Sequence, residues 1–108
     1  MTQAANCFFT ISSQGHTTRQ VSLTGSQQII GRSPEVDITL PDQTVSRQHA
    51  EVYADAHGQW WVKDLNSRNG TLVNNQRITE DHLLQPNDTV AIEQFQLHYA
   101  VEGDLPER

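Results

Sequence analysis

The sequence has very little cysteine, few aromatic residues and no long hydrophobic run. Its 108 residues include one cysteine, Cys7, so no disulfide can form within the chain, and a reducing, cytoplasmic location is expected. No apolar stretch approaches the roughly 20 residues of a membrane helix, and no basic segment followed by an apolar run opens the chain. We therefore expect one domain, monomeric in isolation, with no membrane partner.

Positive charge is also scarce. Thirteen acidic residues oppose seven basic ones, which gives a formal net charge of −6. Non-specific affinity for nucleic acid depends on Lys and Arg contacts with phosphates, so a nucleic-acid partner is not expected. Any anion that this chain binds must be captured by a local arrangement of residues.

The sequence lacks an apolar period of 3.6 residues over the 10–12 residues that a helix needs. It has instead short alternating segments separated by turn residues, which predict an all-β fold, a sandwich or a barrel. The predicted strands are residues 7–11, 17–23, 28–30, 37–40, 49–54, 59–64, 71–73, 89–92 and 95–101. Residues 1–6 are predicted to be a flexible N-terminus, 7–101 the domain, and 102–108 a C-terminal tail or linker.

Two adjacent tryptophans are predicted to point in opposite directions, because strand residues alternate between faces. If Asp55 pairs with Gln59, Trp60 enters the core and Trp61 faces Tyr53 on the outer surface. Such a cross-strand pair can stabilise the sheet by itself. Alternatively, Tyr53 and Trp61 form a second protein-binding interface.

Three predicted loops repeat one chemistry, since each joins an arginine to a hydroxyl and to turn-forming residues. They are Gly31-Arg32-Ser33, Ser46-Arg47-Gln48-His49 and Ser67-Arg68-Asn69-Gly70. A phosphate monoester carries about two negative charges and three acceptor oxygens, which guanidinium, hydroxyl and turn N–H groups satisfy. If the loops converge at one end of a sandwich, they form an anion cradle; otherwise they are ordinary turns with solvated arginines.

These motifs resemble the forkhead-associated (FHA) domain family, whose pattern is Gly-Arg, then Ser-x-x-His, then Ser/Thr-x-Asn-Gly. The likeness extends over residues 29–97. It implies an eleven-stranded sandwich of two sheets that binds phosphothreonine peptides through loops at one end. The expected partner is therefore a phosphothreonine-containing protein in Ser/Thr-kinase signalling.

The resemblance also implies roles for individual residues. The expected phosphopeptide contacts are Arg32, Ser46, Arg47, Ser67, Arg68 and Asn69. Among these, Asn69 would hold the main chain of the ligand and the others would contact the phosphate or its surroundings. The residues expected to shape the loops are Gly31, His49 and Gly70.

Two positions depart from the family pattern near the last hairpin. Asn87 stands where the family often has Gly, a mild change because Asn tolerates a left-handed turn. Glu93 also stands at a frequent Gly position. The geometry of the last hairpin is therefore an open question at this stage.

Enzymatic and metal-binding functions find little support in the sequence. The five histidines show neither i, i+4 pairing nor Cys–His spacing, so no metal or other cofactor is expected. A Ser46, His49 and Asp64 set could be drawn as a catalytic triad, but His49 fits a loop brace better. The main alternative to a phosphothreonine reader is a phospho-independent interaction domain of the same fold that uses its outer sheet face.

Overall fold

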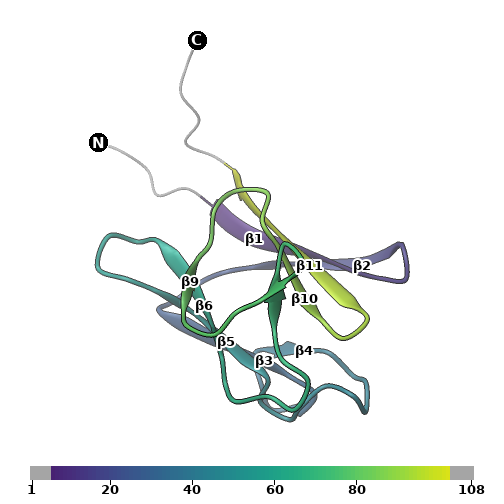
Figure 1. The fold of residues 1–108 in the computed structure, drawn as a ribbon. Helices are drawn as coiled ribbons and strands as arrows, with labels where there is room; N and C mark the ends of the chain where they lie inside the picture. Colours follow the sequence, from purple (N-terminus) through teal and green to yellow (C-terminus); the bar gives the residue numbers. More distant parts are fainter. Residues whose placement is uncertain (1–5, 103–108) are drawn as a thin grey trace.

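The computed structural model describes residues 6–102, which form two β-sheets and no helix (Figure 1). No helix capable of crossing a membrane occurs among these residues. The strands are β1 (Asn6–Ser13), β2 (His16–Ser22), β3 (Gln27–Gly31), β4 (Ile38–Thr39), β5 (Ala50–Ala54), β6 (Trp60–Asp64), β7 (Leu72–Val73), β8 (Gln76–Arg77), β9 (His82–Leu83), β10 (Thr89–Ile92) and β11 (Phe95–Glu102). The predicted all-β fold is confirmed, as a sandwich.

The two sheets divide the chain unequally. One has six strands in the order β2-β1-β11-β10-β7-β8, and the other has five in the order β4-β3-β5-β6-β9. Every pair is antiparallel except β3 with β4. Asn6 pairs with Glu102, so both belong to strands, while the rest of the predicted terminal segments, residues 1–5 and 103–108, lies outside the described residues.

The core lies between the sheets and follows the alternation seen in the sequence. On β5 and β6, Val52 and Val62 are fully buried partners, and Trp60 is 6% exposed. Tyr53 pairs with Trp61 on the opposite, outer face, and the Asp55 N–H donates to the Gln59 carbonyl at 2.8 Å. The predicted register of this hairpin is therefore confirmed.

Three local predictions differ from the structure. The turn between β1 and β2 is the pair Gln14-Gly15, because β1 continues through Ser13. Gly31 is the last residue of β3 and not a loop residue. Strands β8 and β9 were not predicted, since an element of two residues has too few positions to show alternation.

Left-handed residues close several turns. Asn74 (φ 52°) and Asn75 (φ 72°) both have positive φ, as a two-residue hairpin of type I′ requires. Asn87 (φ 78°) confirms that Asn replaces Gly in the turn before β10. Glu93 (φ 55°) also adopts this conformation, between β10 and β11, where an ordinary side chain is strained.

Replacing Glu93 with glycine should therefore stabilise the fold. Gly removes a steric cost of roughly 1–2 kcal/mol in the left-handed region, offset by about 0.5–1 kcal/mol of backbone entropy. We expect Glu93→Gly to raise the free energy of unfolding by about 0.5–1 kcal/mol, measured by urea denaturation. Gln94→Gly, at the neighbouring turn position without positive φ, is the matched control and should lower stability. Equal effects of the two changes would contradict this account.

Candidate functional site

The three arginine-bearing segments meet at one end of the sandwich, at the lower end in Figure 1, away from the Asn6–Glu102 pair. They are the connections at residues 32–37, 40–49 and 65–71. The Arg32 N–H donates to the Ser46 carbonyl at 3.0 Å, and the Ser33 N–H donates to the Arg47 carbonyl at 3.3 Å. These backbone bonds join the first two loops directly.

The close approach of these two loops requires glycine at position 31. A Cβ atom built there would overlap the Arg47 carbonyl oxygen and lie 2.7 Å from its carbon. Because the obstacle is backbone, it cannot swing aside as a flexible side chain could. Gly31 therefore permits the packing that places Arg32 beside Ser46.

His49 connects the second loop to the third from beneath. Its side chain is fully buried, its Nδ1 accepts the Ser46 N–H at 3.1 Å, and its Nε2 lies 2.8 Å from the Gly70 carbonyl. A carbonyl only accepts, so Nε2 carries the proton and the ring is the neutral tautomer. The ring thus satisfies one backbone group in each loop and leaves no nitrogen free for proton transfer.

Ser46 completes the junction on the outer side. Its Oγ accepts the Arg68 N–H at 3.0 Å, which leaves the hydroxyl proton free to donate to a ligand. Arg47 and Arg68 are exposed, and Arg32 is half-exposed. One hydroxyl donor and three arginine residues therefore belong to a single loop junction.

Two further side chains donate hydrogen bonds to backbone carbonyls of the loop between β4 and β5. Arg32 Nη1 donates to the Gln43 carbonyl and Asn69 Nδ2 donates to the Thr44 carbonyl, both at 3.3 Å. That loop is shaped by Asp42, whose Oδ1 accepts the Thr44 N–H at 2.8 Å and the Thr44 hydroxyl at 2.5 Å. These bonds from Thr44 lower the pKa of Asp42, so its carboxylate remains ionised near neutral pH.

Ser67 lies differently from the prediction that it contacts a ligand. It is buried, and its Oγ donates to Asp64 Oδ1 at 2.6 Å while accepting the Gly70 N–H at 2.9 Å. Thr71 also donates to Asp64, at 2.7 Å. Burial acts to raise the pKa of Asp64, but hydrogen bonds from Ser67 and Thr71 outweigh it and leave the pKa below its usual value. Ser67 therefore holds the loop closed from within.

The sequence analysis did not predict that Asp42, Thr44 and Asp64 support the loops at this end of the molecule. Asp42-Gln43-Thr44 is a recognisable signal, because an Asp side chain often bonds to the backbone two residues onward. For Asp64, which precedes Ser67 by three residues, the sequence carried no comparable signal. Its partner Thr71 lies on the far side of the loop.

Every Lys and Arg side chain of residues 6–102, at the junction and elsewhere, lies more than 4.0 Å from any carboxylate of these residues. Within residues 6–102, the one ion pair joins His82 to Asp88 at 3.1 Å. Arg32, Arg47 and Arg68 thus have no carboxylate within 4.0 Å. Their charges remain available for an anion, and guanidinium groups suit the several oxygens of a phosphate.

The predicted second interface lies away from this junction, whereas Gly70 is part of it. Tyr53 and Trp61 occupy the outer face of the five-stranded sheet, in the middle of β5 and β6. Gly70 has φ +89°, and its Cα is covered by the Arg77 side chain. No group of three or more His, Cys, Asp or Glu side chains that could hold a metal ion occurs in residues 6–102.

Comparison with known proteins places this geometry in context. The FHA domain profile matches residues 29–93. The chain is 45% identical over 67 residues to the oxoglutarate dehydrogenase inhibitor of Corynebacterium efficiens, covering 62% of this chain and 46% of that protein. It is 43% identical over 67 residues to the glycogen accumulation regulator GarA of Mycolicibacterium smegmatis, covering 62% and 41%. The chain thus spans less than half the length of these curated relatives.

Solved structures give the same result in three dimensions. Mycobacterium tuberculosis EmbR in complex with a low affinity phosphopeptide superposes with a TM-score of 0.84 at 27% identity, over 97% of this chain and 27% of that one. A chain from a structural and functional analysis of phosphothreonine-dependent FHA domain interactions gives 0.78 at 28% identity, over 88% and 95%. Because the profile covers more than half of the sequence and the fold agrees, this chain belongs to the FHA domain family.

Proposed function

We propose that this chain is a phosphothreonine-peptide recognition module that mediates phosphorylation-dependent protein–protein interaction in Ser/Thr-kinase signalling. The observation that carries the proposal is the loop junction, where hydrogen bonds from the Arg32, Ser33 and Arg68 N–H groups bring the three arginine-bearing segments together at Ser46 and Arg47. Membership of the FHA family supports the choice of phosphothreonine over other anions. Its role is binding and not catalysis, since the buried His49 has both ring nitrogens engaged by backbone groups.

The proposed contacts divide into two groups. Arg32, Ser46, Arg47 and Arg68 bind the phosphate, because they present guanidinium or hydroxyl donors around one point. Asn69 binds the main chain of the peptide next to the phosphothreonine, since its Oδ1 is free while Nδ2 is anchored on the Thr44 carbonyl. Gly31, His49, Ser67 and Gly70 are assigned to the loop scaffold.

The same proposal includes a regulatory role and a cytoplasmic location. The similar proteins are named as an inhibitor of oxoglutarate dehydrogenase and a regulator of glycogen accumulation, so a regulatory role through a bound partner suits this chain. A cytoplasmic setting agrees with the single, unpaired cysteine. The phospho-independent alternative is separated from this proposal by the first experiment below.

Binding should depend on the phosphate and on two loop residues. A peptide selected from a phosphothreonine library should bind with micromolar affinity, about −8 kcal/mol, and its unphosphorylated form should not. Arg32→Ala and Asn69→Ala should each cost roughly 1.5–3 kcal/mol, the range for hydrogen bonds to charged groups, measured by calorimetric titration. Lys63→Ala removes the same charge away from the loops and should change affinity by less than about twofold. Equal heats for phosphorylated and bare peptides would contradict the proposal.

Affinity should fall as pH drops below about 6, where the phosphate regains its second proton and loses one charge. Asp42 and Asp64 have lowered pKa values, so the loop stability that they supply is lost only below the unfolded pKa of 3.8 and stays constant between pH 8 and 5. The control is a difluoromethylene phosphonate peptide, whose second proton dissociates at lower pH. Its affinity midpoint, measured by fluorescence anisotropy, should shift downward. An identical midpoint for both ligands would mean that a protein group titrates.

His49→Ala should act on stability. The change strips two buried backbone groups, the Ser46 N–H and the Gly70 carbonyl, of their partner, at about 1–3 kcal/mol each. We expect a loss of about 2–4 kcal/mol in chemical denaturation, while His57→Ala in the exposed turn after β5 should cost little. A His49→Ala protein that unfolds like the wild type but no longer binds phosphopeptide would overturn the brace assignment.

A further inference from the structure

The outer face of the five-stranded sheet carries an aromatic pair in its centre. The rings of Tyr53 and Trp61 are parallel to within 5°, with centroids 6.4 Å apart. Leu83 on β9 is the strand partner of Trp61, and Ile29 lies on the same face of β3. All four side chains are half-buried and no other element of residues 6–102 covers them.

Three carboxylates surround this pair, and each is held by a neutral donor. The Trp61 indole N–H donates to Asp55 Oδ2 at 2.8 Å, and the Tyr53 hydroxyl donates to Asp81 Oδ2. Glu51 accepts the Gln27 side-chain amide at 2.8 Å. A neutral donor orients a carboxylate without compensating its charge. Lys63 is the strand partner of Glu51 on this same face, so the three carboxylates and this lysine leave two net negative charges.

The pKa of Tyr53 reflects the negative charges around it. Its hydrogen bond to Asp81, partial burial and the charges of Asp81, Glu51 and Asp55 raise the pKa of Tyr53 to about 12. The Trp61 hydrogen bond lowers the pKa of Asp55, so that carboxylate stays ionised at neutral pH. The potential around the aromatic pair is therefore negative.

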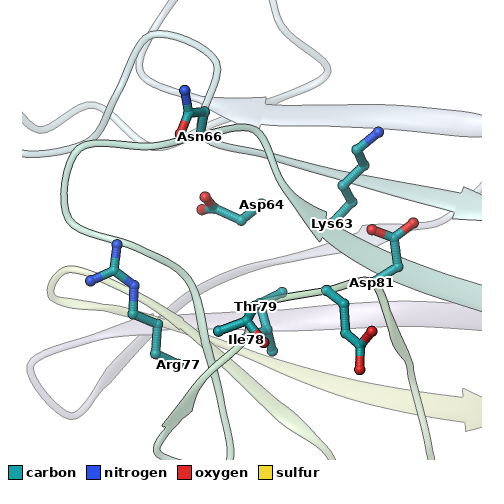
Figure 2. Close-up of a pocket in the computed structure, with 8 residues that line it drawn as sticks. Lys63, Asp64, Asn66, Arg77, Ile78, Thr79 and Asp81 are labelled. Atoms are coloured by element: carbon teal, nitrogen blue, oxygen red, sulfur yellow. The ribbon is translucent and has the colours of Figure 1, made fainter.

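The acidic surface continues into a groove of about 560 Å³ between the end of β6 and the segment that follows β8 (Figure 2). Asp64, Glu80 and Asp81 line it against two cations, Lys63 and Arg77. In Figure 2 Lys63 and Asp81 lie at one end and Arg77 at the other. Lys63 is the only Lys or Arg on the five strands of this sheet.

We propose that this acidic aromatic face, defined by Glu51, Tyr53, Asp55, Trp61 and Asp81, binds an extended arginine- or lysine-rich segment of a partner protein. A guanidinium or ammonium group is attracted to the aromatic rings and to the ionised carboxylates beside them. The groove at Asp81 and Glu80 offers a place for a second cation of the same segment. This surface is separate from the arginine loops, so the two sites favour opposite charges.

The first test uses a defined probe. An acetylated, amidated heptapeptide of alternating glycine and arginine is titrated into the ¹⁵N-labelled chain and followed by NMR. The Trp61 indole N–H and the amides of residues 51–55 and 81 should shift. Raising the salt from about 0.05 to about 0.5 M should weaken binding roughly several-fold, because salt screens surface charges. The matched peptide with citrulline in place of arginine should cause no shifts. Shifts confined to other acidic regions, or no shifts, would refute the proposal.

Isosteric variants distinguish a built surface from general attraction between an acidic chain and a basic peptide. Asp81→Asn and Glu51→Gln each keep an oxygen acceptor for Tyr53 and Gln27 while removing the charge. Together they should weaken arginine-peptide binding by roughly five- to tenfold, since two nearby charges are lost. Glu93→Gln in the β10–β11 turn, combined with Glu35→Gln in the loop after β3, makes the same change in net charge elsewhere. If this control pair weakens binding equally, the attraction is non-specific and the proposal fails.

The two sites should also be separable. Trp61→Ala should weaken arginine-peptide binding by about threefold or more, and leave short phosphothreonine peptides within about threefold. Arg32→Ala should do the reverse, weakening phosphopeptide binding by roughly ten- to 150-fold while the arginine peptide binds as before. Failure of the phosphopeptide experiment alone would leave the acidic face standing, and failure of the arginine peptide alone would leave the phosphothreonine site standing. A Trp61→Ala protein that binds the arginine peptide unchanged would assign the aromatic pair to sheet stability only.

Discussion

The candidate site depends on one buried imidazole. One ring nitrogen of His49 accepts a hydrogen bond from the Ser46 N–H, and the other donates one to the Gly70 carbonyl. The ring therefore connects two loops that are far apart in the sequence. Gly31 allows the first loop, which carries Arg32, to approach the second because it has no side chain. The exposed arginines could not be held around one hydroxyl without this internal frame, since flexible loops lose conformational entropy when they are ordered.

Charge is distributed with opposite signs on two parts of a small molecule. The loop end presents Arg32, Arg47 and Arg68 without carboxylate partners, whereas the outer sheet face presents carboxylates that are bonded only to neutral donors. A net charge of −6 therefore conceals a local cationic end. In the two proposals above, the phosphorylated segment and the basic segment occupy different surfaces, so neither ligand competes for the other's site.

Asparagine occupies several turn positions whose positive φ would usually favour glycine. Asn66, Asn74, Asn75 and Asn87 all have positive φ, a conformation that Asn tolerates because its side chain can bond locally. Gln14 (φ 55°) and Glu93 (φ 55°) have no such compensation, so the sequence and the fold conflict at these two turn positions. The strain at Glu93 lies in the last hairpin, outside the three arginine-bearing segments.

Alternation and turn residues alone determined the all-β class, the strands with four or more residues and the Tyr53–Trp61 register, because these depend on local periodicity. The loop motifs also pointed to the residues to which we assign the phosphopeptide contacts, with Ser67 among them although the structure places its hydroxyl inside the loop. The short strands β8 and β9, the inward hydroxyl of Ser67 and the support from Asp42 and Asp64 emerged only from the tertiary structure. The reason is physical: a Ser or Asp side chain has the same chemistry whether it faces solvent or a neighbouring loop, and only the packed backbone decides which partner it reaches.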